Sequence, residues 1–305
     1  MHFFFEQLVS GLTVGAIYAL LGLGYALMFG VLKVLNLAHG DVYMVGAFIG
    51  FYVLTGLGGP GNLSVPVPVV VLLMLLAAGT GSGLLGLSIE RFAFRPLREA
   101  PRTSALIASL GISFVLEYIV LLIFTANVRS YSASDFVPFS SGVQIGSLKI
   151  WTMRIFVLVL AVLLMFVLRA LVERTRLGKA VRAVAFDREA AAMMGIDVDR
   201  TIATTFFISS AVAGIAGVMF GLLFSQVWFQ MGFVATLKGL TASVVGGIGN
   251  MAGAMLGGFL IGLAEAFTTG YISATYQNLM VFGILIVVML VRPNGLLGRP
   301  AVQKV

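Results

Sequence analysis

The stretch VLKVLNLAHGDVYMVGAFIG, residues 31–50, decides what kind of fold this chain can adopt. It places Lys33, Asn36, His39 and Asp41 between two apolar runs, with almost no loop to separate them. Irregular backbone is tolerated at membrane depth only where protein or a water-filled cavity surrounds it, because its polar groups need partners. The stretch therefore predicts a helix that stops and restarts within or near a membrane.

The composition of the whole chain requires a solvent that is largely lipid. Hydrophobic residues make up 60% and charged residues 10% of the 305, whereas soluble domains are about 25% charged. The absence of cysteine excludes disulfides and thiolate metal sites, and His2 and His39 are too far apart to suggest a metal cluster. The net charge of +7 fits loops that set membrane orientation better than nucleic-acid binding.

Long apolar runs predict the membrane helices. A spanning helix needs about 20 apolar residues, and such runs lie near 8–30, 42–57, 66–88, 104–126, 152–171, 202–226, 253–272 and 277–291. A ninth, glycine-rich run lies near 233–250. The first residues, MHFFFEQ, hold no Lys or Arg, so the first run reads as a retained span rather than a cleaved signal peptide. The predicted fold is an all-α integral membrane protein: one transmembrane domain, 1–305, with about eight or nine helical elements and interrupted helices.

Basic residues predict the orientation. Fourteen of the 19 Lys and Arg lie in three clusters, which are Arg91, Arg95, Arg98 and Arg102; Arg169, Arg174, Arg176, Lys179, Arg182, Arg188 and Arg200; and Arg292, Arg299 and Lys304. The positive-inside rule makes these segments cytoplasmic. The loop at about 127–150 holds few basic residues and is then external. The N-terminus falls outside and the C-terminus inside, which requires an odd number of crossings, so either 233–250 crosses or another run does not.

A second interrupted stretch is predicted at residues 237–262, LKGLTASVVGGIGNMAGAMLGGFLIG, which holds eight glycines. Paired interrupted helices in the two halves of a chain indicate a transport pathway. The predicted pathway residues are Asn36, His39, Gly40, Asp41, Gly246, Gly247, Gly249 and Asn250. The alternative for the glycines alone is close helix packing through small residues.

The loop at about 172–201 carries an unusual segment, REAAAMMGID at 188–197. Asp187 can cap a short helix there, Glu189 suits its first turn, and Gly195 suits its end. Ala190 and Ala191 would give the helix a small face that a partner's groove could approach closely, and Met194 would adapt to an irregular pocket. The alternative is a solvated loop helix with no partner.

At this point the sequence resembles a known family. EAAAMMG is similar to the coupling-helix signature of the permease subunits of ATP-driven importers, although the apolar-x-Leu-Pro ending of that signature is absent. GAIYALLGLGYALMFGVLKVLNLAHGD, RTRLGKAVRAVAFDREAAAMMGIDVDR and LTASVVGGIGNMAGAMLGGFLIGLAE resemble the branched-chain (hydrophobic) amino-acid ABC permeases, and most of all their smaller permease subunit.

The resemblance implies partners and roles. The expected partners are a second homologous permease, two ATP-binding cassette subunits and an extracytoplasmic solute-binding protein, in a bacterial inner membrane. ATP would be bound by the partner subunits and no cofactor by this chain. The residues expected to couple to the ATPase are Arg182, Asp187, Glu189, Ala190, Ala191, Met194 and Gly195.

Two carboxylates, Glu117 and Glu265, fall inside apolar runs, where each needs a partner, a cavity or a proton. The expectation is that they hydrogen-bond to a Ser, Thr or Tyr of a neighbouring helix. A rival hypothesis is a self-sufficient carrier driven by an ion gradient, with both as ion sites. The sequence has no Gly-x4-Gly-Lys-Ser/Thr pattern, so no ATP hydrolysis is expected of this chain. The predicted function is that of the permease of an ATP-driven importer for branched-chain or related apolar amino acids, with urea or short amides as alternative substrates.

Overall fold

The structure is a computed structural model that describes residues 2–58, 65–131, 142–145 and 148–298. Its principal elements are α1 (His2–Leu32), α2 (His39–Gly56), α3 (Val67–Ile89), α4 (Arg102–Phe124), α6 (Thr152–Arg174), α7 (Arg176–Phe186), α8 (Arg188–Met193), α9 (Val198–Phe224), α10 (Met231–Gly246), α11 (Met251–Tyr271) and α12 (Gln277–Val291). A π-helical turn, η1 (Glu90–Phe94), continues α3, and a 3₁₀ turn, η3 (Ala274–Tyr276), precedes α12. Every apolar run expected from the sequence overlaps one of these helices, and some runs extend one to four residues past its end.

Short antiparallel strand pairs lie among the helices. Strand β1 (Arg129–Ser130), after α4, pairs with β4 (Gln226–Val227), after α9. Strand β2 (Gly142–Ile145) pairs with β3 (Leu148–Trp151) just before α6. The β1–β4 pair ties together the ends of two helices that are distant in sequence. Half of the predicted 127–150 loop, residues 132–141 and 146–147, lies outside the described residues.

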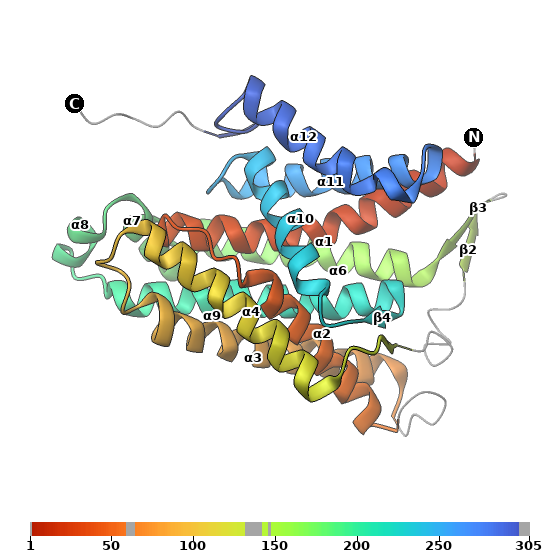
Figure 1. Ribbon diagram of the computed structural model, residues 1–305, viewed down its shortest axis with the longest axis horizontal. Coiled ribbons are helices and arrows are strands. Elements are labelled where there is room, and N and C mark those ends of the chain that lie inside the picture. Colours follow the sequence, from red (N-terminus) through yellow and green to blue (C-terminus); the bar gives the residue numbers. More distant parts are fainter. Residues whose placement is uncertain (1, 59–64, 132–141, 146–147, 299–305) are drawn as a thin grey trace.

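Within the described residues, seven helices are long and apolar enough to cross a membrane. The shorter α10 and the more polar α2 bring the helices of the bundle to nine over that part of the chain. We call the end that carries α7 and α8 the α8 end, and the end that carries the N-terminus and the β2–β3 pair the hairpin end (Figure 1). The last described residues lie at the α8 end, because Gly298 packs on Gly247 and the adjoining Ile248–Ala252 share a pocket with Arg169 and Arg182. The first and last described residues are therefore at opposite ends of the bundle, as an odd number of crossings requires.

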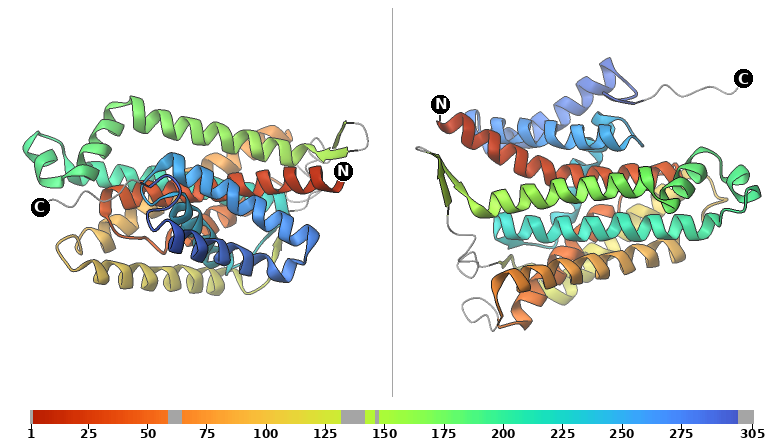
Figure 2. Two further views of the ribbon diagram at one scale, coloured as in Figure 1. Left: turned by 90° about the horizontal axis from the view of Figure 1, so that it is seen from above. Right: turned by 180° about the vertical axis from the view of Figure 1, so that it is seen from behind.

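Helix α1 forms the centre of the bundle, and helices α4, α6 and α12 lie at its edge (Figure 2). The side chains of Ala16 and Ile17, like most that follow them to Leu23, are fully buried. Close approach to α11 depends on glycine, since a Cβ on Gly262 would overlap the backbone of Gly15. By contrast, Val281 is the one buried residue of α12, whose other side chains leave an apolar surface suited to lipid.

Both predicted interruptions are present. Helix α1 ends at Leu32, Lys33 has a left-handed backbone (φ 58°), and α2 begins only at His39. In the second half, α10 ends at Gly246 and α11 begins at Met251. The turn between α10 and α11 contains Gly247 (φ 118°) and Gly249 (φ 80°), backbone conformations that favour glycine.

Candidate functional site

The α1–α2 break, residues 33–38, is held by its own asparagine and by α10. Asn36 is 1% exposed, and its side-chain oxygen accepts a hydrogen bond from the backbone N–H of Ala38 at 3.1 Å. The Thr236 hydroxyl, on α10, donates to the carbonyl of Leu37 at 3.0 Å. Gly40 packs so tightly on Gly232 and Thr236 that a Cβ would overlap both. The start of α2 is thus seated on the start of α10.

Two buried polar side chains at the start of α2 are incompletely satisfied. His39 is fully buried, and neither of its ring nitrogens has a hydrogen-bond partner within the part of the chain that the structure describes. The Asp41 Oδ2 atom accepts from the Ser113 hydroxyl of α4, while Oδ1 has no partner. Buried polar groups are normally paired, so unpaired ones indicate a functional role or unseen water. Asn36, His39, Gly40 and Asp41 therefore lie together at the interruption, and their role in a pathway stays a prediction.

The glycine-rich half of the predicted pathway lies in the turn between α10 and α11. The Asn250 side chain donates to the carbonyl of Leu297 at 2.6 Å, and Leu297 N–H donates to the carbonyl of Gly246 at 2.9 Å. A Cβ on Gly246 would overlap the carbonyl of Gly253 on α11. Gly246, Gly247, Gly249 and Asn250 thus form a helix–helix turn that packs on the C-terminal segment. In the described residues they make no hydrogen bond to the α1–α2 break, and the expectation that both sets line one pathway stays a prediction.

The partner of Glu265 is a lysine that the sequence analysis missed. Lys238 Nζ on α10 lies 2.6 Å from Glu265 Oε1 on α11 and 3.1 Å from the Tyr18 hydroxyl on α1. The two charged side chains are 6% and 13% exposed. Glu265 thus joins helices through an ion pair, where hydrogen bonds to Ser, Thr or Tyr were expected. The usable signal was Lys238 itself, a lone cation within an apolar run. Glu117 lies one turn beyond Ser113 on α4 and is 9% exposed.

Helix α8 has the predicted ends. The Asp187 side chain accepts from the N–H groups of Glu189 (3.0 Å) and Ala190 (3.1 Å), and Gly195 follows the helix with φ 80°. Ala191, however, is 4% exposed and belongs to a hydrophobic cluster within this chain. The expectation that Ala191 faces a partner was wrong, because the helix turns that side chain towards α7 and α9.

The outward face of the α7–α8 segment is apolar. Phe186 is 87% exposed, and Met193 and Met194 are each 82% exposed. Ala190 and Ala192 are exposed beside them. We call Phe186, Ala190, Ala192, Met193 and Met194 the α8 surface. These residues lie on the α7–α8 segment, at the α8 end of the bundle (Figure 1). Exposed apolar groups in such a place mark an interaction site.

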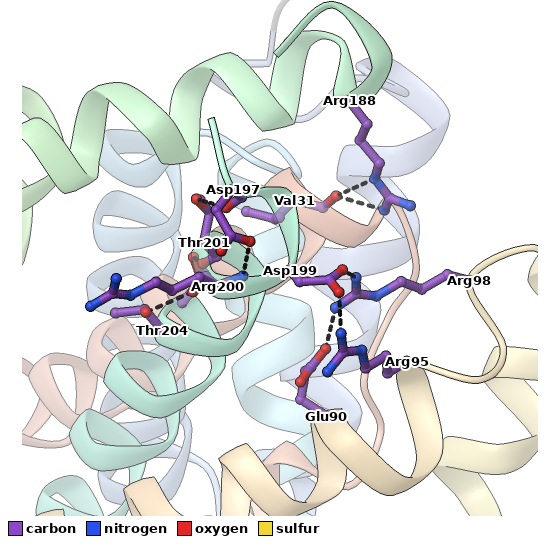
Figure 3. Close-up of polar contacts among 11 residues, drawn as sticks. Val31, Glu90, Arg95, Arg98, Arg188, Asp197, Asp199, Arg200, Thr201 and Thr204 are labelled. Carbon is purple, nitrogen blue, oxygen red and sulfur yellow. Dashed lines mark hydrogen bonds and ion pairs between the residues drawn. The ribbon is translucent and has the colours of Figure 1, made fainter. Parts of the chain in front are cut away.

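Two arginines tie α7 and α8 to the membrane helices. The Arg188 guanidinium donates to the carbonyl oxygen of Val31, near the end of α1, at 2.7 and 3.2 Å (Figure 3). Arg182 donates to the carbonyl of Val172, near the end of α6. Both bonds satisfy carbonyls that the end of a helix leaves open. Arg182 therefore bonds to α6 of this chain, and Arg188 joins α8 to the end of α1, two residues before the α1–α2 break.

An ion-pair network holds the α8 end together. Arg98 bonds both Glu90, on η1, and Asp199, in the first turn of α9, and Arg95 bonds the other oxygen of Asp199 (Figure 3). Glu90 and Arg98 are largely buried, with side chains 3% and 14% exposed, while Arg95 is 46% exposed. The buried arginine therefore links two membrane helices beside the α7–α8 segment.

This is the architecture of a membrane permease: a multi-pass helical bundle with an interrupted helix at its core and a capped helix with an apolar surface at one end. The chain belongs to the family described as the permease component of branched-chain amino acid transport systems, which matches residues 7–290.

Full-length relatives agree with this membership. The chain is 40% identical to the high-affinity branched-chain amino acid transport system permease protein BraD of Pseudomonas aeruginosa, covering 100% of this chain and 99% of BraD. It is 37% identical to the corresponding protein LivH of Escherichia coli K12, over 99% and 98% of the two chains. A probable LivH permease of Methanocaldococcus jannaschii is 29% identical, over 92% and 88%. The chain is therefore a multi-pass membrane permease, one component of a transport system, and not an enzyme.

Proposed function

We propose that this chain is the membrane-spanning permease of an importer that takes up branched-chain or related apolar amino acids, driven by ATP hydrolysis on separate subunits. The full-length identity of 40% to BraD supports the substrate class. The proposed partners are a second homologous permease, two ATP-binding cassette subunits and an extracytoplasmic solute-binding protein. Glu265 is a poor ion site because its carboxylate is already paired with Lys238, and this weighs against a gradient-driven carrier.

The orientation proposed for this chain puts the α8 end in the cytoplasm. Arg98 and Arg102 line one cavity with Arg188, Lys179 lies on α7, and Arg292 precedes the C-terminal segment that packs on Gly247 at that end. The positive-inside rule then places the N-terminus outside and the C-terminus in the cytoplasm of a bacterial inner membrane. ATP-binding subunits would approach from the α8 end.

The α8 surface is the proposed ATPase docking site, and its exposure is the observation that carries the proposal. Two methionines that are each 82% exposed are costly in water and adapt to an irregular groove. Asp187 and Gly195 set the ends of the helix that presents them. The α1–α2 break, with His39 and Asp41, is the proposed part of the translocation path.

Replacement of Met194 by glutamate tests the docking site. A charge on the α8 surface would be desolvated in the packed interface, so the purified complex should lose its ATPase subunits while the permease reaches the membrane at the parent level. Leu297→Glu is the matched control, because Leu297 is 46% exposed at the α8 end outside that surface. Co-purification of ATPase subunits with Met194→Glu at the parent level would reject the site.

A further inference from the structure

A cavity of about 540 Å³ opens at the α8 end, beside the α8 surface, whose Phe186 also lines it. It lies between the end of α1, the η1–α4 connection and the α7–α8 turn. Its charged lining residues are the cations Lys33, Arg98, Arg102 and Arg188 and the carboxylates Asp187 and Glu189. The cavity has the size of an ordinary small-molecule site, and cations predominate in its wall.

Two of these cations have protein partners and two do not. Arg98 bonds Glu90 and Asp199, and Arg188 bonds the carbonyl of Val31 (Figure 3). The side chains of Lys33 and Arg102 have no hydrogen-bond or ion-pair partner among residues 2–58, 65–131, 142–145 and 148–298. The Asp187 carboxylate is already engaged, because its Oδ1 accepts hydrogen bonds from the N–H groups of Glu189 and Ala190.

The like charges in this wall act on one another. Burial, together with the guanidinium groups of Arg188 and Arg102, holds the pKa of the Lys33 ammonium below its usual range. Burial, with Arg98 and Arg102, likewise lowers the pKa of Arg188. The first turn of α4, which includes Arg102 and Ala105, also lines the cavity and adds the positive end of a 23-residue helix. An anion in the cavity would relieve this repulsion.

We propose that this cavity binds a phosphate-bearing anion through Lys33 and Arg102, with Arg188 beside it. Cationic pockets between membrane helices on the cytoplasmic side suit lipid headgroups. Helix α4 leads from the cavity into a surface suited to acyl chains, since Ile107 is 70% and Phe114 53% exposed. An anionic phospholipid and free inorganic phosphate present the same oxygens, and the test separates them.

A bound phosphate group would also act on the contact between α8 and the end of α1, beside the α1–α2 break. Lys33 is the first residue of the break, and Arg188 joins α8 to Val31. A phosphate between them would screen their mutual repulsion and stabilise the two elements in this arrangement. This ligand would be bound by the permease itself and is distinct from the transported substrate.

The test uses the purified full-length chain in neutral detergent, with phosphatidylglycerol, phosphatidylcholine or inorganic phosphate added. Retained lipid is measured by native mass spectrometry and protection by thermal unfolding. The double variant Lys33→Gln/Arg102→Gln is compared with Arg176→Gln/Lys179→Gln, which removes the same charges from exposed positions of α7 outside the cavity. Each cation is worth roughly a factor of five, so the cavity variant should bind phosphatidylglycerol about 30-fold more weakly.

Each result decides the proposal. Phosphatidylglycerol retained by the parent and the α7 variant but not by the cavity variant identifies the site and its lipid source. Protection by inorganic phosphate alone, lost in the cavity variant, identifies free phosphate as the source. Equal binding in all three proteins, or no binding by the parent, overturns the proposal. Lys33 and Arg102 would then be expected to pair with carboxylates of a docked subunit.

Discussion

The guanidinium group of Arg188, the first residue of α8, donates both of its described hydrogen bonds to the carbonyl oxygen of Val31, one residue before the end of α1. The α1–α2 break begins two residues later, at Lys33. We expect a movement of α8 to act through this contact on the backbone beside the interruption of the membrane helix. Further along, the break is held by Thr236 of α10.

The orientation predicts a labelling pattern, which is easy to read because the native chain has no cysteine. Val128 is 58% exposed before β1, and Lys179 is exposed on α7. A membrane-impermeant maleimide added to intact cells should label Val128→Cys and leave Lys179→Cys unlabelled until the membrane is opened. The reverse pattern would invert the topology and remove the α8 surface from the cytoplasm.

Arg98 and Arg95 share the carboxylate of Asp199 but should differ in what their loss costs. Arg98→Ala leaves Glu90 buried without its cation, which costs about 3–5 kcal/mol of stability for a buried pair. Arg95→Ala removes a half-exposed partner and should cost roughly 0–1 kcal/mol. Thermal unfolding of the purified permease measures both. Equal losses would mean that burial of Glu90 does not control the network.

The pair of Lys238 and Glu265 should be structural. Lys238→Met leaves a buried carboxylate unpaired and should lower the thermal stability and membrane level of the protein. Adding Glu265→Gln removes that charge, so the double variant should recover most of the loss. Recovery of stability and uptake together is expected. A stable double variant with no uptake would instead assign the pair a role in transport.

Glycines in similar helices should respond differently to a methyl group. Gly257 of α11 faces the carbonyl of Ala242 on α10, and a Cβ would overlap it. Gly283 of α12 has nothing within 4 Å of the position of a Cβ. Gly257→Ala should therefore separate α10 from α11 and destabilise the protein by about 1–3 kcal/mol, while Gly283→Ala should be neutral or slightly stabilising. Similar melting temperatures for the two variants would contradict the packing.

Local sequence was enough to predict the helices and their interruptions. Apolar runs mark the spans, the charges of residues 33–41 mark the first break, and Asp187 and Gly195 mark the ends of α8. These features depend on neighbours in the chain, so they can be recognised without knowing the packing.

Features that depend on packing between distant segments could not be predicted. Ala191 and Ala190 are adjacent and chemically identical, yet only the packing on α7 and α9 buries one of them. The pairing of Lys238 with Glu265 joins residues on two helices, and the apolar run gave no register between them. The same holds for Gly246 and Asn250, whose contacts are made by the C-terminal segment.

The coupling role of Arg188 is the central claim, and uptake per ATP hydrolysed tests it most directly. In proteoliposomes containing the whole transporter, Arg188→Gln leaves the α8 surface intact, so the ATPase subunits should stay bound and hydrolyse ATP. Loss of the charged hydrogen bonds to Val31 should lower amino-acid uptake per ATP at least about tenfold. Arg188→Lys keeps the charge and can still donate to Val31, so its uptake per ATP should lie between those of the parent and Arg188→Gln. A parent-level ratio of uptake to ATP hydrolysis in Arg188→Gln would contradict coupling through this contact.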